Sequence, residues 1–112
     1  MIRLETGVRI DTMSSQIVLA MIIADNVLRS FESNDLVITS ICEGKHSRGS
    51  LHYIGHAFDI RLPSLDTTKN LIIVNKLNDA LNAHSTNLKS FDVVLEHNHI
   101  HIEYQPKIGL NL

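Results

Sequence analysis

One stretch near the C-terminal end of the chain decides the fold: residues 91–104 read FDVVLEHNHIHIEY. Two runs rich in β-branched and aromatic residues, Phe91–Glu96 and His99–Tyr104, flank the pair His97-Asn98. Asn98 tolerates left-handed backbone angles, which suits a tight turn. The stretch therefore predicts a β-hairpin that turns through His97-Asn98.

The second arm of this hairpin is expected to have one polar and one apolar face. In a strand, successive side chains point to opposite sides, so His99, His101 and Glu103 share one face while isoleucines occupy the other. An upstream run, His56–Leu62, alternates in the same way and places Asp59 opposite its apolar neighbours. We therefore expect the polar faces of two strands to converge above a common core.

The remaining elements complete an α+β pattern. Apolar residues at intervals of three or four predict a helix over Ser14–Phe31, and Leu36–Thr39 reads as a buried strand. Asp66 is expected to cap a second helix that runs to Ala83. The inward stripe predicted for this second helix is Leu71, Val74, Leu77 and Leu81.

The order of these elements predicts an antiparallel sheet covered by two helices. A doubly wound parallel sheet is the less favoured alternative, because the strands do not alternate regularly with helices.

Length and composition limit the possible functions. A chain of 112 residues is expected to form a single domain, residues 1–112. Its net charge of -2 argues against nucleic acid or an anionic membrane as a partner. No export signal is visible and no apolar stretch is long enough to span a bilayer, so we expect synthesis in a cytoplasm and no membrane insertion. Cys42 is the only cysteine, which excludes an intrachain disulfide.

Histidine is the unusual feature of the composition. Six of the seven histidines lie in two short clusters, residues 46–56 and 97–101. A single histidine in a strand is more often a surface or core side chain than a ligand, but an inward-facing Asp is costly unless it is paired or coordinated. Imidazoles and a carboxylate that meet on one sheet face suit a borderline-soft divalent ion, and three protein ligands leave a position open for water.

The histidine clusters resemble a known family. Residues 50–59, SLHYIGHAFD, fit the Ser-x-His-x-x-Gly-x-Ala-x-Asp signature of the D-alanyl-D-alanine peptidase and hedgehog-like zinc metallopeptidases, peptidase family M15. His99-Ile100-His101 resembles the His-x-His strand of several members. The resemblance runs from Val37 to Pro106 and is greatest to the small phage-encoded members.

The resemblance implies a role for each matching residue. It makes His52, Asp59 and His101 the ligands of a zinc ion and Glu96 the general base that acts on the water at the metal. It implies that His99 stabilises the oxyanion of the transition state. Glu103 is the competing candidate for the base.

Three further residues are candidates for substrate binding: Ser50, Lys45 and Arg48. Ser50 is expected to hydrogen-bond near the metal. Many relatives carry an arginine shortly after a strand that ends in Thr-Ser, whereas here Ile41, Cys42 and Glu43 follow. Lys45 or Arg48 would take the place of this arginine, unless both are merely solvated loop charges.

The function implied by the resemblance is a zinc-dependent peptidase, expected to be a monomer. It would cut the stem peptides of bacterial peptidoglycan, as a D,D-carboxypeptidase or as an endolysin-type endopeptidase, and would act on the cell wall as a phage lysis protein or virion component. The alternatives are a catalytically inactive zinc-containing binding module of the same fold, and a structural zinc site that His99 closes as a fourth ligand.

Overall fold

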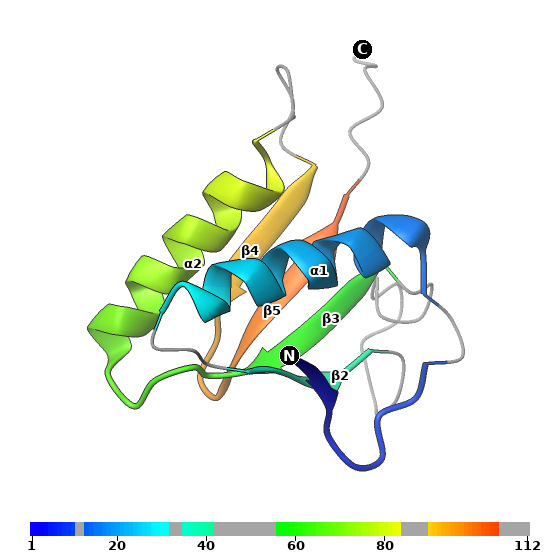
Figure 1. The fold of residues 1–112 in the computed structure, drawn as a ribbon, viewed down its shortest axis with the longest axis horizontal. Coiled ribbons are helices and arrows are strands. Elements are labelled where there is room, and N and C mark those ends of the chain that lie inside the picture. Colours follow the sequence, from blue (N-terminus) through cyan, green and yellow to red (C-terminus); the bar gives the residue numbers. More distant parts are fainter. Residues whose placement is uncertain (11–12, 32–34, 42–55, 84–89, 106–112) are drawn as a thin grey trace.

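The structure is a computed structural model that describes residues 1–10, 13–31, 35–41, 56–83 and 90–105 (Figure 1). Within these ranges the elements in chain order are β1 (Ile2–Leu4), α1 (Ser15–Arg29), β2 (Leu36–Ser40), β3 (Ala57–Arg61), α2 (Thr67–Leu81), β4 (Phe91–Leu95) and β5 (His99–Tyr104).

The strands form one mixed sheet in the order β1-β2-β3-β5-β4. The pairs β2–β3, β3–β5 and β4–β5 are antiparallel, whereas β1 and β2 are parallel. The predicted α+β class and the hairpin are confirmed, but the expected antiparallel sheet is only partly right, because β1 and β2 are parallel. The strand that makes the sheet mixed, β1, has only three residues, too few for the alternation of Ile2-Arg3-Leu4 to indicate a strand.

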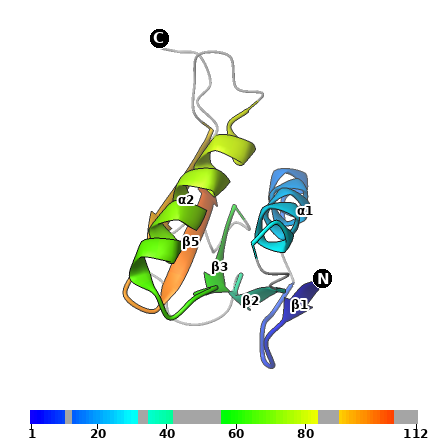
Figure 2. The ribbon, with the colours of Figure 1, turned by 60° about the vertical axis from the view of Figure 1, so that its left-hand side comes forward.

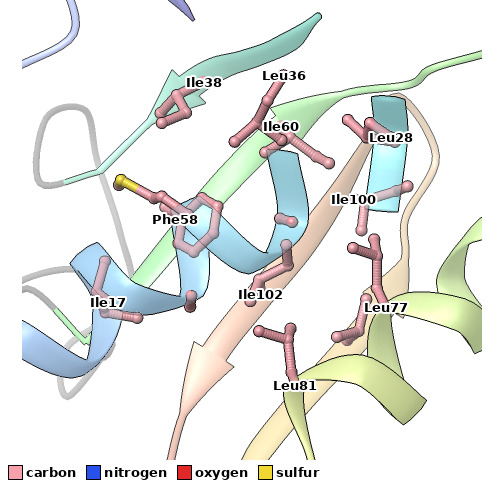
Figure 3. Close-up of a cluster of buried hydrophobic side chains, with 14 of the residues drawn as sticks. Ile17, Leu28, Leu36, Ile38, Phe58, Ile60, Leu77, Leu81, Ile100 and Ile102 are labelled. Atoms are coloured by element: carbon pink, nitrogen blue, oxygen red, sulfur yellow. The ribbon is translucent and has the colours of Figure 1, made fainter. Parts of the chain in front are cut away.

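Both helices lie on the same face of the sheet (Figures 1 and 2). Helix α1 provides the connection between the parallel strands β1 and β2, which a tight turn cannot join. Figure 3 shows the core between the layers, where β3 and β5 contribute Phe58, Ile60, Ile100 and Ile102, all fully buried. The alternation predicted for these two strands is therefore confirmed, and their other face is turned away from the helices.

Both helices have an N-cap residue, Ser14 for α1 and the predicted Asp66 for α2. The Ser14 hydroxyl accepts a hydrogen bond from the Ile17 N–H at 3.2 Å, and the Asp66 carboxylate accepts one from the Thr68 N–H at 2.9 Å. Each cap satisfies one of the N–H groups that a helix start leaves without an intrahelical partner. Helix α1 ends at Arg29, before the predicted boundary at Phe31.

Val74, Leu77 and Leu81 of the stripe predicted for α2 are buried, but Leu71 is not. Leu71 is 49% exposed, whereas Ile73 is 2% and Asn70 3% exposed. Asn70 can occupy a buried position because its amide group is satisfied: its Nδ2 donates to the Ser64 carbonyl at 2.9 Å and its Oδ1 accepts from the Ser64 N–H at 3.0 Å. The prediction is wrong only in the first turn, where the polar residue Asn70 is buried and Leu71 is not.

A second asparagine ties the end of α2 to the sheet. The side-chain oxygen of Asn82 accepts hydrogen bonds from the N–H groups of Ser90 and Phe91, at 3.1 and 3.0 Å. Its amide nitrogen donates to the carbonyls of Phe91 and Asn78, both at 3.0 Å. Asn82 thus fixes the first residue of β4 against the last turn of α2.

Candidate metal centre

Two of the three predicted zinc ligands meet on the face of the sheet that the helices do not cover. Asp59 on β3 and His101 on β5 are direct partners in the antiparallel register. Asp59 Oδ1 lies 2.8 Å from His101 Nδ1, and the two side chains are 13% and 20% exposed. The predicted convergence of polar side chains from these strands is confirmed for this pair.

Glu103 holds the other side of the His101 ring. Its Oε1 lies 2.7 Å from His101 Nε2, while the amide of Gln105 donates to the second carboxylate oxygen. The hydrogen bond to Asp59 raises the pKa of His101 above the ordinary value of 6.5, and Glu103 adds to this effect against the opposing effect of burial. Each ring nitrogen of His101 therefore faces a carboxylate.

His99 lies beside this pair, two residues earlier on the same strand face. Its Nε2 is 3.7 Å from Asp59 Oδ1, and its Nδ1 is 2.7 Å from the side-chain oxygen of Asn98 in the hairpin turn. His99 also lines a polar cavity of about 340 Å³, whose described walls are Glu5, Thr39, Asp59, Arg61, Asn98 and His99. The cavity gives a small ligand room next to Asp59.

Glu96, the predicted general base, lies where β4 enters the hairpin turn. Its N–H donates to the His99 carbonyl at 2.9 Å, so the two residues are opposite each other across the hairpin. Opposite residues of an antiparallel pair project to the same side, which puts Glu96 on the sheet face of His99 and His101. The Glu96 side chain is exposed, and its role as base remains a prediction.

Several predicted site residues lie outside the described residues: His52, the third expected ligand, and Ser50, Lys45 and Arg48. Across the ranges that the structure describes, no group of three or more His, Cys, Asp or Glu is arranged to hold a metal ion.

The donor chemistry of the described pair fits zinc. Tetrahedral zinc takes nitrogen and oxygen donors at about 2.0–2.2 Å, which separates two such donors by about 3.3 Å. Asp59 Oδ1 and His101 Nδ1, at 2.8 Å, would need to separate by only about 0.5 Å to admit the ion. The contact of Glu103 with Nε2 matches the common arrangement in which the second ring nitrogen of a metal-binding histidine donates to a carboxylate.

The sequence pattern led to a different role for Glu103 and to no role for Arg61. It indicated Glu103 only as a competing base, whereas the structure puts its carboxylate against His101. It gave no role to Arg61, which lines the cavity with Asp59. The signal was available, because the period-two rule puts Arg61 on the face of Asp59 and Glu103 on the face of His101.

Comparisons with known proteins add no relative: no protein-family model matches the chain, and no curated protein gives a significant match. In the described parts of the chain, neither helix has the length and apolar character that a membrane-spanning segment requires.

Proposed function

We propose that the protein is a zinc-dependent peptidase that hydrolyses peptide bonds in the stem peptides of bacterial peptidoglycan, with a hedgehog/DD-peptidase-like fold. The observation that carries the proposal is the pairing of Asp59 with His101 beside a polar cavity. The resemblance of residues 50–59 to the peptidase signature supports the choice of metal and reaction.

The residues that would hold zinc are Asp59, His101 and His52. Bound zinc supplies a Lewis acid and lowers the pKa of a coordinated water to about 7. Glu103 would fix the tautomer of His101, because a carboxylate that accepts the Nε2 proton leaves the Nδ1 lone pair directed at Asp59 and the ion.

Two further side chains would carry the proton and the developing charge. Glu96, opposite His99 across the hairpin, would accept a proton from the attacking water and return it to the leaving amine. His99, which borders the cavity, would donate a hydrogen bond to the carbonyl oxygen as negative charge develops on it.

The protein would act on peptidoglycan either as a D,D-carboxypeptidase or as an endolysin-type endopeptidase. The protein would reach its substrate as a phage lysis protein or as a component of a virion.

The test is hydrolysis of peptidoglycan fragments by the zinc-loaded protein, with products identified by mass spectrometry. We expect cleavage within stem peptides, loss of both zinc and cleavage in Asp59→Asn, and loss of cleavage with zinc retained in Glu96→Gln. Asp79→Asn, an exposed carboxylate on α2, is the matched control and is expected to behave as the unchanged protein. Intact peptides across several wall chemistries would refute the proposal.

The second candidate is a structural zinc site that His99 closes as a fourth ligand, and the position of His99 favours it. Its Nε2 is 3.7 Å from Asp59 Oδ1, close enough for a small movement to make it a fourth ligand that closes the metal site. In that case the protein binds zinc but cuts no peptide, and His99→Ala weakens zinc binding. In the peptidase, the same substitution lowers cleavage while zinc stays bound.

A further inference from the structure

Arg61 is the positively charged side chain among the described walls of the cavity beside the metal pair. It lies on β3 two residues after Asp59 and is the register partner of His99 on β5. Its side chain is 59% exposed. A guanidinium is thus held at the rim of the cavity that also contains Asp59 and His99, where it is accessible to a ligand from solvent.

Glu5 holds Arg61 in this place. Its Oε2 lies 3.2 Å from one terminal nitrogen of the Arg61 guanidinium, and Glu5 lines the same cavity. The backbone of Glu5 is itself fixed, because its N–H donates to the Ile38 carbonyl of β2 at 2.9 Å. The ion pair with Glu5 engages one edge of the guanidinium, and the planar fork has further N–H donors that suit a carboxylate.

We propose that Arg61 binds a carboxylate of the substrate and so makes the site selective for peptides with a free carboxylate close to the cleaved bond, with Glu5 as its positioning residue. This inference rests on the proposed peptidase function, which it deepens by naming the substrate class.

Charge and placement support this ligand class. A metal ion at Asp59 and His101 would put positive charge beside the cavity whose wall also holds the guanidinium of Arg61. Asp59 and Arg61 are two residues apart on one strand, a rise of about 6.6 Å, which a peptide carbonyl and a carboxylate of the neighbouring residue would span. Arginine is well suited to this task because its donors match the two oxygens of a carboxylate.

The test measures binding of two probes, acetyl-D-alanyl-D-alanine and its C-terminal amide, to zinc-loaded protein by NMR titration. The protein carries Glu96→Gln so that the peptide bond is expected to survive the measurement. We expect the carboxylate probe to bind at least about ten-fold more tightly than the amide, the size of a hydrogen-bonded interaction with a charged group. Arg61→Gln should remove most of this preference, and Arg61→Lys should restore part of it.

The controls show whether the preference for the carboxylate probe depends on Arg61 or on the loss of any guanidinium. Arg29→Gln removes a guanidinium of similar exposure, 58%, that pairs with Asp25 on α1 instead, and it should leave the preference unchanged. Glu5→Gln should weaken the preference less than Arg61→Gln does. Equal binding of both probes to the starting protein, or a preference that survives Arg61→Gln, would overturn the inference.

The same variants distinguish this inference from the proposed function. If the protein with Glu96 intact cuts stem peptides and Arg61→Gln keeps the carboxylate preference, the peptidase stands and the role of Arg61 fails. If no peptide is cut but the preference depends on Arg61, the carboxylate site stands and the peptidase fails. In an active enzyme, Arg61→Gln should raise KM for the carboxylate substrate far more than for the amide.

Discussion

Replacing Glu103 with alanine removes the carboxylate that holds Nε2 of His101, 2.7 Å away. Nδ1 is the ring nitrogen nearer to Asp59, the other proposed ligand that the structure describes, so Nδ1 is the atom expected to coordinate zinc. Nε2 then carries the ring proton and donates it to Glu103. The variant leaves that donor without its acceptor and leaves the ring free to turn away from Asp59.

The expected loss is in zinc affinity. Removing a carboxylate that supports a ligating histidine typically weakens metal binding by about 10- to 100-fold, or about 1.4–2.7 kcal/mol. Glu103 is 19% exposed and the His101 ring 20%, so solvent only partly compensates for the lost contact. The zinc affinity of Glu103→Gln should fall between those of Glu103→Ala and the unchanged protein. The amide oxygen of the glutamine still accepts the Nε2 proton but carries no negative charge.

The assay is a competition titration of zinc between the protein and a chromophoric chelator. Asp92→Ala provides the control, because Asp92 lies opposite Glu103 on β4 and its removal takes away the same charge at the same level of the sheet. We expect that control to change affinity by less than about three-fold, as for a screened charge without a direct contact. Zinc bound by Glu103→Ala as tightly as by the unchanged protein would refute the role assigned to Glu103.

Two further predictions concern the metal-free protein and its fold. In the presence of a chelator, an NMR titration should place the pKa of His101 above 6.5, and Asp59→Asn should lower it. The pKa of His101 is higher in the folded state than in the unfolded state. The stability that protonated His101 contributes is therefore fully present below pH 6.5 and is lost as pH rises through the raised pKa. A measured pKa at or below 6.5 would contradict this prediction. Asn82→Ala should lower the free energy of unfolding by about 1–3 kcal/mol, since it leaves backbone groups of β4 without partners. Denaturant unfolding measures this loss, and an unchanged midpoint would show that water replaces the side chain.

The meeting of Asp59 with His101 follows from sequence only in part. Alternation places each residue on the polar face of its strand, but adjacency needs the register between β3 and β5. That register pairs Phe58 with Ile102 and Ile60 with Ile100, so the core fixes it: a slip by one residue would turn these side chains out to solvent. Pattern alone does not show which two strands are neighbours.

Other features left weaker signals or none. The parallel strand β1 has only three residues, so its short apolar–polar–apolar pattern does not identify it as a strand. In the first turn of α2, the burial of Asn70 depends on hydrogen bonds to Ser64 that no periodicity reveals. Arg61 shares a face with Asp59 by simple alternation, yet its place in a cavity depends on Glu5, more than fifty residues away in the chain.

The most direct test of the central claim is anomalous diffraction at the zinc absorption edge from crystals grown with zinc. The account predicts one strong peak at about 2.0–2.2 Å from a carboxylate oxygen of Asp59 and from Nδ1 of His101, with Nε2 still bound to Glu103. A peak elsewhere, or no peak while Asp59 and His101 keep their direct hydrogen bond, would contradict it.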